Sequence, residues 1–200
     1  QAVSVESSAM PQGLFDAALE STSQPITAKS ARSGGLDFTF RAGGLQATNL
    51  NWGIALNGFG RGNQVDALGA AETAQVEGRL EVRRVELTEW RRATAFGLEQ
   101  GFTIPQSPSG KGALVLQLDL STDLDGILDA DGRGLSFHAG DGQTLRYDHL
   151  RAWDANGAEL DAKLVYAPGQ IRIVVRDAGA AYPVTIDPLI YLEQKVVSSD

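Results

Sequence analysis

Residues 182–200 read YPVTIDPLIYLEQKVVSSD, and this stretch decides how the rest of the chain is interpreted. Apolar and polar residues alternate at 184–186, which predicts a β-strand. Asp187-Pro188 then removes a ladder hydrogen bond, so we expect the chain to turn a corner there. A second apolar run, 189–197, follows this corner. We therefore expect residues 189–200 to begin a further region, whose apolar residues, such as Ile190, pair with protein downstream or with another chain.

Most of the chain before this stretch alternates with a period of two, the pattern of half-buried strands. The clearest case is a predicted central strand with one apolar face formed by Leu114, Leu116, Leu118 and Leu120. Further strands are predicted at 36–41, within 45–56, and at 96–104, 134–137, 144–147, 150–154, 159–166 and 170–176.

Turn signals separate several of these strands, among them Asp131-Gly132, Asp141-Gly142 and Asn156-Gly157. Such pairs are typical of hairpin turns. Short strands at this spacing predict an all-β fold, either an antiparallel β-sandwich or a related β-fold. At most one short N-terminal helix is expected, at 13–20, where apolar residues have helical spacing.

Two details of the strand pattern have specific interpretations. Leu80 and Val82 occupy even positions whereas Val85 and Leu87 occupy odd ones, so one buried face requires an inserted residue. We therefore predict a β-bulge at Arg83-Arg84.

A glycine-rich run at 58–62 reads GFGRG. It resembles a phosphate-binding loop only superficially, because neither a helix nor a βαβ pattern follows it. The prediction there is a flexible glycine loop.

Several blocks of the sequence are similar to one protein family. They are GAAYPVTIDP at 179–188, LEQKVVSSD at 192–200, Glu89-Trp90 followed by GLEQGFTI at 97–104, and YDHLRAWDANG at 147–157. The first resembles the YPltIDP signature that closes a domain in large bacterial surface proteins. The second resembles the opening of an FG-GAP, integrin-α-like β-propeller repeat. The family's usual Trp-Tyr after the glutamate is Trp90-Arg91 here.

This resemblance extends from about residue 89 to residue 200 and suggests how the chain is divided. We predict an N-terminal extension at 1–35, an all-β module at 36–188 and the start of an FG-GAP-like repeat region at 189–200. The resemblance implies an exported, extracellular or cell-surface bacterial protein of the adhesion type. In it, this module would have a structural or interaction role without enzymatic activity.

The implied partner is the downstream propeller of the same polypeptide, together with other copies of the module, surface proteins or glycans. The alternative hypothesis is a carbohydrate- or ligand-binding β-sandwich. A polysaccharide-processing enzyme domain is the third.

Composition restricts other classes of partner and cofactor. A net charge of −8 argues against nucleic acid, which requires a basic surface to displace counterions. No apolar run approaches the roughly 20 residues that cross a bilayer, so membrane insertion is not expected. The absence of cysteine excludes disulfides, thiolate metal sites and thiol catalysis. No cofactor is expected, apart from a calcium ion held by clustered aspartates.

The candidate metal ligands are four closely spaced carboxylates, Asp123, Asp125, Asp129 and Asp131. Oxygen ligands clustered in a turn suit calcium. The EF-hand spacing is not met, because placing Gly132 at the loop glycine puts Ile127 at the first ligand position. A polar hairpin turn is therefore the favoured interpretation, and calcium binding is the alternative.

Other residues have side chains of the kinds that bind sugars or catalyse their hydrolysis. Trp52, Trp90 and Trp153 could form a sugar-stacking platform, although aromatic residues of a β-sandwich more often lie in the core. Pairs among Glu86, Glu89 and Glu99 could serve glycoside hydrolysis, which requires two carboxyl groups across a cleft. Solvated strand faces are the simpler interpretation of these glutamates.

The only histidines are His138 and His149. Asp148-His149 suggests part of a catalytic triad, but the sequence has no G-x-S-x-G nucleophile motif to accompany it. No catalytic residues are predicted.

Overall fold

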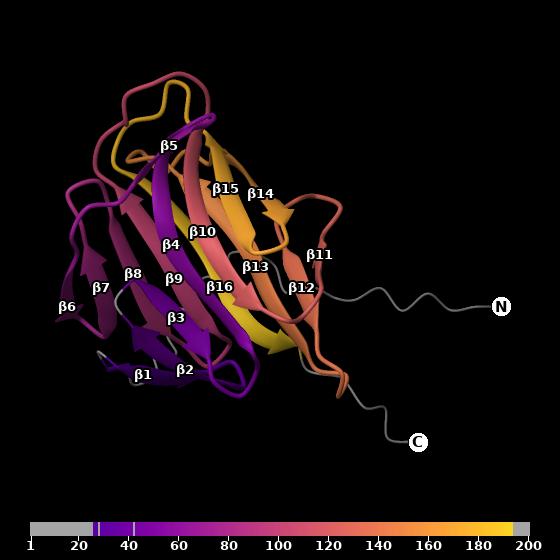
Figure 1. The fold of residues 1–200 in the computed structure, drawn as a ribbon. Coiled ribbons are helices and arrows are strands. Elements are labelled where there is room, and N and C mark those ends of the chain that lie inside the picture. Colours follow the sequence, from indigo (N-terminus) through magenta and orange to yellow (C-terminus); the bar gives the residue numbers. More distant parts are fainter. Residues whose placement is uncertain (1–25, 28, 42, 194–200) are drawn as a thin grey trace.

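A computed structural model describes residues 26–27, 29–41 and 43–193. These residues form two antiparallel sheets of eight strands each, which pack face to face (Figure 1). The predicted all-β sandwich is confirmed. The helix expected at 13–20 lies outside the described residues. Among the residues described, no helix has the length and hydropathy that crossing a bilayer requires.

The first sheet has the strand order β1-β2-β3-β4-β10-β15-β14, and β5 pairs with the end of β4. Its strands are β1 (Ser30–Ser33), β2 (Leu36–Arg41), β3 (Gly44–Ala47), β4 (Trp52–Arg61), β5 (Gln64–Ala67), β10 (Leu114–Thr122), β14 (Asp161–Ala167) and β15 (Gln170–Arg176). As predicted, β10 is central, because it lies between β4 and β15.

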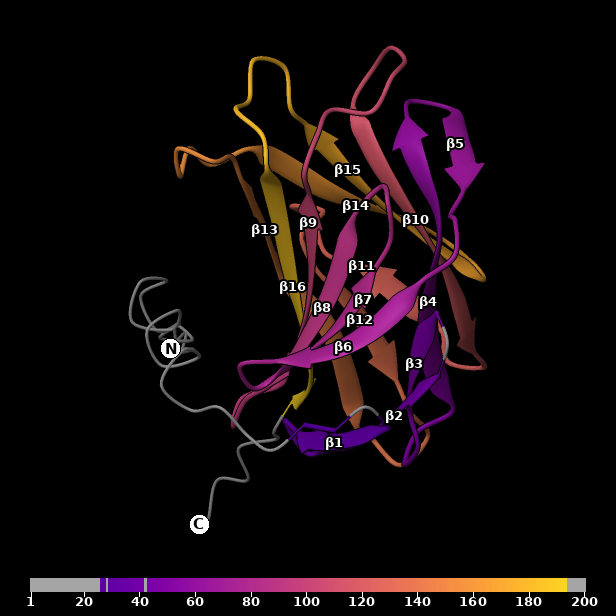
Figure 2. The same ribbon diagram turned by 90° about the vertical axis from the view of Figure 1, so that its left-hand side faces the viewer.

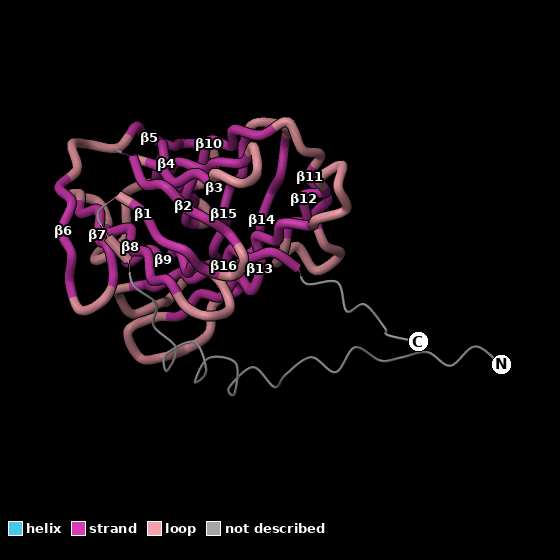
Figure 3. The backbone as a smooth tube through the Cα atoms, turned by 90° about the horizontal axis from the view of Figure 1, so that it is seen from below, coloured by secondary structure: helices cyan, strands magenta, loops and turns pink. Residues whose placement is uncertain are grey.

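The second sheet has the order β11-β12-β13-β16-β9-β8-β7-β6. Its strands are β6 (Glu72–Val76), β7 (Arg79–Arg83), β8 (Thr88–Ala93), β9 (Leu98–Ile104), β11 (Gly126–Leu128), β12 (Leu135–His138), β13 (Thr144–Trp153) and β16 (Val184–Glu193). Viewed from below, β4 and β10 form one layer and β9 and β16 the other (Figure 3).

The core fills the space between these layers with the apolar residues of alternating strands. The even-numbered leucines of β10 face inward, and so do Trp52 of β4 and Phe137 of β12. The rings of Trp52 and Phe137 meet edge to face, with centroids 5.8 Å apart. Burial of such side chains contributes about 1.5–3 kcal/mol each, and it supplies most of the stabilisation of a sandwich.

The last strand, β16, differs from its predicted course. It does not end at Asp187-Pro188 but continues to Glu193, paired with β13 on one side and β9 on the other. Ile190 is fully buried, so it belongs to this sandwich and not to a later region. Whether a repeat region begins beyond Glu193 stays a prediction. Residues 194–200 lie outside the described part.

Pro188 is tolerated inside β16 because the ladders on both sides are irregular at that point. The pairing with β13 shifts between Asp148 and Arg151, and the pairing with β9 omits Pro188. A proline within a sheet is found at such bulges, where no N–H donor is needed. His149, at the shift, has a positive φ of 56°. The shift in pairing falls between the predicted strands at 144–147 and 150–154. The structure joins these two segments into one strand, β13.

The predicted bulge at Arg83-Arg84 is wrong. The chain instead reverses direction between β7 and β8, and the amide of Arg84 donates to the carbonyl of Leu87 at 2.9 Å. Leu87 is buried as expected, but Val85 is 92% exposed at the tip of the turn. The shift in alternation therefore marks a hairpin turn here. A turn, like a bulge, changes whether even-numbered or odd-numbered residues face the core.

Because Val85 lies in solvent, the variant Val85→Ser should change the free energy of unfolding by less than about 0.5 kcal/mol. Urea denaturation of the parent and the variant measures this difference. A bulged strand that buried Val85 would instead lose several kcal/mol, so a loss of that size would contradict the hairpin.

The predicted glycine loop is also wrong, because Gly58 to Arg61 lie within β4 and pair with β5. Glycine is required there by close packing. A Cβ atom on Gly58 would lie 2.5 Å from Val65 Cγ1, and one on Gly60 would lie 2.0 Å from the carbonyl oxygen of Gln64.

The N-terminal extension predicted at 1–35 includes a strand of the sandwich. β1 pairs with β2, and Ser33 Oγ donates at 2.6 Å to the carbonyl of Thr94, the residue that follows β8 of the second sheet. β1 and β2 lie at the lower end of the sandwich and β5 at the upper end (Figure 2).

Candidate functional site

A polar cluster lies between the two sheets, contributed by β8, β9 and β13. Glu89 Oε1 accepts hydrogen bonds from Arg91 Nη2 at 2.8 Å and from Gln100 Nε2 at 2.9 Å. The hydroxyl of Tyr147 donates to Gln100 Oε1 at 3.3 Å. Arg91 also lies over the ring of Phe40 in the first sheet, 5.2 Å from its centroid. All four polar residues are 0% exposed, so this buried cluster cannot meet a solute without opening the sandwich.

The buried cluster unites the sequence blocks that carry the family resemblance. Glu89 and Gln100 come from one block and Tyr147 from another, and the YPVTIDP block supplies the first half of β16. In the sheet these segments are the neighbouring strands β13, β16, β9 and β8. Within the described residues, which end at Glu193, the resembling blocks therefore contribute one continuous part of the second sheet.

The electrostatics of the buried cluster indicate a structural role. Burial raises the pKa of Tyr147 well above its usual value, and the charges of Glu89 and Asp187 raise it further. The phenol therefore stays protonated and can donate to Gln100. Glu89 Oε2 is buried and has no hydrogen-bond partner among the described residues. The carboxylate thus depends on Arg91 for compensation of its charge.

A second cluster, centred on Arg61 at the end of β4, joins three loops at the upper end. The Arg61 guanidinium makes a two-pronged ion pair with Asp177, with Nη1–Oδ1 at 2.9 Å and Nη2–Oδ2 at 2.6 Å. It also donates to Ser107 Oγ at 2.6 Å and to the carbonyls of Pro108 and Gly112. The cluster therefore holds the β9–β10 loop against the loop that connects β15 to β16.

Tyr182 of the YPVTIDP block completes this Arg61 cluster by donating a short hydrogen bond to Asp177 Oδ2. Burial raises the pKa of Tyr182 to about 12, and the bond to Asp177 adds to the effect. Burial opposes ionisation of Asp177 as well, but the hydrogen bonds from Arg61 and Tyr182 outweigh it and lower the pKa of that carboxyl.

This lowered pKa predicts an acid-sensitive contribution to stability. Asp177 stabilises the fold above its unfolded pKa of about 3.9, and the contribution is lost as pH falls through the lower folded pKa. As pH falls below about 4, the free energy of unfolding of the parent should therefore fall more steeply than that of Asp177→Asn. Denaturation at a series of pH values measures both slopes. Parallel curves would show that Asp177 is not coupled to folding.

The four aspartates predicted as calcium ligands do not converge. Asp129 binds Arg146, with Oδ2 2.5 Å from Nη2, and Asp131 Oδ1 accepts from the amide of Arg133 at 2.9 Å in a turn. Asp123 and Asp125 are exposed in the bend before β11. Within the described part of the chain, no group of three or more His, Asp or Glu side chains is placed to hold a metal ion.

Arg146 occupies the position that a cation would take between Asp129 and Asp148, of which only Asp129 is among the four predicted ligands. It donates to Asp129, to Asp148 Oδ2 at 2.6 Å and to Ser136. Burial disfavours its charge, but the two carboxylates outweigh burial and raise the pKa of Arg146. Gly134 makes room for this contact, because a Cβ there would lie 2.4 Å from Asp129 Oδ2.

Because Asp129 is already paired, we expect millimolar calcium to leave the melting temperature unchanged. Binding to the folded state alone would raise it by mass action. Differential scanning fluorimetry with calcium and with a chelator makes the comparison. An upward shift that disappears in Asp129→Asn would show that the loop binds the ion.

The tryptophans do not form an exposed platform. Trp52 is fully buried, and Trp90 packs on Gly101, where an added Cβ would lie 1.9 Å from its Cζ2 atom. Trp153 is half-buried beneath Arg151, whose guanidinium lies 5.8 Å from the ring centroid.

The candidate catalytic carboxylates have different surroundings. Glu89 belongs to the buried cluster, Glu99 pairs with Arg92 at 2.5 Å, and Glu86 lies in the β7–β8 turn.

The two histidines are also separate. His138 Nδ1 lies 3.1 Å from Thr144 Oγ1 across the β12–β13 hairpin. The ring of His149 lies against Tyr191, with centroids 5.8 Å apart.

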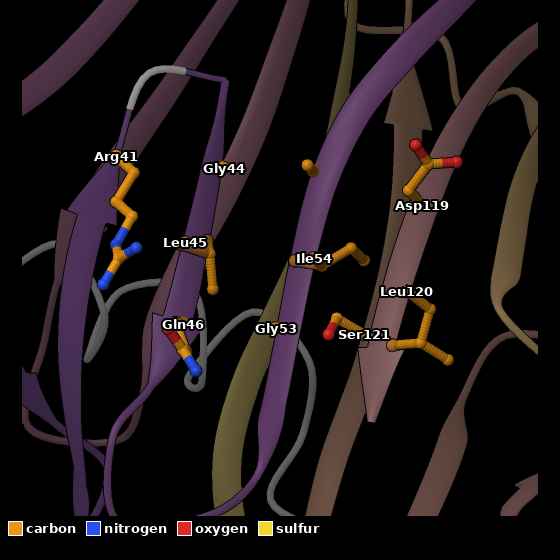
Figure 4. Close-up of a pocket in the computed structure, with 10 residues that line it drawn as sticks. Arg41, Gly44, Leu45, Gln46, Gly53, Ile54, Asp119, Leu120 and Ser121 are labelled. Carbon is orange, nitrogen blue, oxygen red and sulfur yellow. The ribbon is translucent and has the colours of Figure 1, made fainter. Parts of the chain in front are cut away.

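A shallow trough of about 310 Å³ crosses β3, β4 and β10 (Figure 4). Gly44 and Gly53 leave its floor without side chains, and a Cβ on Gly44 would lie 2.9 Å from that of Ala55. Arg41 lies on one side of the trough and Asp119 on the other. No tryptophan lines the trough, so it lacks the aromatic surface on which sugar rings stack.

Sequence patterns did not reveal Arg61, Arg91 and Arg146, which organise the three polar clusters. Alternation in β8 and β13 does indicate on which face of the sheet Arg91 and Arg146 lie. Arg91 shares the face of Glu89, and Arg146 lies on the face opposite to Tyr147. It cannot indicate their partners, which come from other hairpins. Arg61 was hidden by the surrounding glycines, which suggested a loop.

Comparisons of this chain with family models, with curated proteins and with solved structures found no match.

Proposed function

We propose that this chain is a non-enzymatic structural and interaction module of an exported bacterial surface protein, which precedes and presents a β-propeller of FG-GAP-like repeats. The sequence resemblance supports the class of protein. The observation that carries the proposal is the continuity of the resembling blocks within the described residues, where they contribute the adjacent strands β13, β16, β9 and β8. A set of short matches that packs into one sheet is better support than the same matches scattered over the fold.

The position of β16 supports a presenting role. This strand is embedded between β13 and β9, and the amide of Leu192 donates to the carbonyl of Gly34 at 2.9 Å. Polypeptide that continues beyond Glu193 would be anchored to the centre of a sheet and not to a frayed edge. Such an anchor transmits force and fixes the origin of the next domain.

The partners of the charged residues support a non-enzymatic role. Three of the carboxylates that the sequence offered for chemistry, Glu89, Glu99 and Asp129, each bind an arginine of the module. Asp177 does the same at the upper end of the sandwich. These pairs connect strands and loops, so their contribution is to stability and orientation.

The proposal is tested first by the sequence that follows Asp200 in the gene, where it requires repeated Phe-Gly and Gly-Ala-Pro blocks. The second test compares the following region expressed alone with the same region preceded by this module. We expect a higher melting temperature and less aggregation when the module is present. A following region without such repeats, or one that behaves identically with and without the module, would refute the proposal.

A further inference from the structure

A cavity of about 480 Å³ lies at the upper end of the sandwich, where three segments distant in sequence meet. β4 ends there beside the start of β10, and the β7–β8 turn is brought to the same end because Thr88 pairs with Thr103 near the end of β9. The cavity is lined by the β4–β5 hairpin, the β7–β8 turn and the β9–β10 loop. The Arg61 cluster fixes that last loop through Ser107, so one wall of the cavity is held in place.

The cavity is acidic. Glu86 and Asp66 line it, and none of its lining residues is a lysine, arginine or histidine. Glu86 is half-buried, and its Oε2 atom is buried without a hydrogen-bond partner among the described residues. A Cβ on Gly69 would lie 3.3 Å from Glu86 Oε1, so the chain passes close to this carboxylate without covering it with a side chain. The site therefore offers negative charge that the described side chains do not neutralise.

Apolar side chains adjoin this charge. Val85, the neighbour of Glu86, is 92% exposed, and Phe59 and Leu68 line the cavity beside it. A hydrated metal ion would gain nothing from such a wall. A long aliphatic stem that ends in a cation would bury its methylene groups against the wall and place its charge at the carboxylates.

We infer that this cavity binds the side chain of an arginine or lysine carried by a partner polypeptide, with Val85 packing against the residue next to it. The net charge of −8 favours approach of a basic partner. The inference deepens the proposed interaction role and rests on it, because it names the surface and the chemistry of the partner.

The test is a titration of the 200-residue chain, labelled with ¹⁵N, with the peptide acetyl-Ala-Arg-Val-amide. The matched probe contains citrulline in place of arginine and so keeps the shape of the side chain but not its charge. We expect saturable shifts of the Gly60, Gly69 and Ser107 amides with the arginine peptide. Binding of the citrulline peptide should be weaker by about tenfold or more, the usual difference between charged and neutral hydrogen bonds.

Two variants locate the effect. Glu86→Gln keeps the size of the side chain and should weaken binding of the arginine peptide by about tenfold. Glu72→Gln, on exposed β6 and outside the cavity lining, removes the same charge from the chain and should bind as the parent does. Unchanged shifts elsewhere in the spectrum show that each variant is folded.

Three results would overturn the inference: equal binding of the two peptides, parental affinity in Glu86→Gln, or no saturable shift below about 10 mM peptide, the weakest affinity expected of such a contact. These failures are distinct from failure of the proposed function, which is judged by the stability of the following region. A module could present a propeller and still have an empty acidic cavity.

Discussion

Arg91→Met is expected to cost about 3–5 kcal/mol of folding free energy, the usual cost of breaking a buried ion pair. The substitution leaves the Glu89 carboxylate in the core with only Gln100 to bind it, and Glu89 is 0% exposed. A buried charge without its partner cannot recover the hydration that it lost on folding. Guanidinium denaturation followed by circular dichroism measures the difference from the parent.

Two further variants separate the ion pair from simple loss of packing. In the double variant Glu89→Met with Arg91→Met, no charge remains, and most of the lost stability should return. Arg32→Met removes a pair with Asp37 that has the same chemistry but lies in solvent, with side chains 82% and 43% exposed. Because solvent screens this exposed pair, this variant should cost far less than Arg91→Met. If Arg91→Met costs no more than Arg32→Met, the buried pair does not stabilise the core.

The second large effect is expected on ending the chain after Leu189. Such a chain lacks the fully buried Ile190 and the pairs that residues 190–193 make with β13. Removing the side chain of a buried isoleucine alone costs about 2–5 kcal/mol, a large part of the roughly 5–15 kcal/mol typical of a domain. The shortened chain should therefore melt at a much lower temperature or remain unfolded.

A chain ended after Glu193 is the matched comparison, because the two proteins then differ only in residues 190–193. Thermal unfolding followed by circular dichroism compares them. Equal melting temperatures would support the boundary at residue 188 that the sequence predicts, and the embedded position of β16 would then be wrong.

Much of the fold could be predicted because alternation reports burial directly. The leucines of β10 and the alternation in β2 (Leu36–Arg41) placed these strands correctly. Asp131-Gly132 and Asp141-Gly142 form turns as expected, since both glycines have positive φ values. These signals are local, because each depends on the nearest neighbours in the chain and on which side faces water.

The errors arose where a local pattern has two physical causes. A shift in alternation accompanies both a bulge and a hairpin turn, and only the exposure of Val85 distinguishes them. Glycines favour loops, but Gly60 lies in a strand. Glycine is required at this position of the strand because a neighbouring carbonyl oxygen occupies the space that a side chain would need. Pro188 usually ends a strand, but the shift in the β13 ladder accommodates it.

The polar clusters could not be predicted, because their members meet only in the folded sheet. Arg61 and Asp177 are far apart in the sequence, and so are Asp129 and Arg146. The four aspartates formed a pattern in sequence, yet Asp129 turns toward an arginine of another hairpin and Asp131 toward its own turn. The spacing of the carboxylates therefore indicated a polar segment, but it did not indicate that the cation bound to Asp129 is an arginine side chain and not a metal ion.

The embedded position of β16 has a consequence for how the protein is made. β16 separates β9 from β13, and β9 lies near the middle of the chain. During synthesis from the N-terminus, the second sheet cannot close until Glu193 has left the ribosome. Contacts between residues so distant in sequence also make folding slow, on the order of milliseconds to seconds. Until that moment the edges of β9 and β13 that β16 covers in the folded sheet have no strand to pair with.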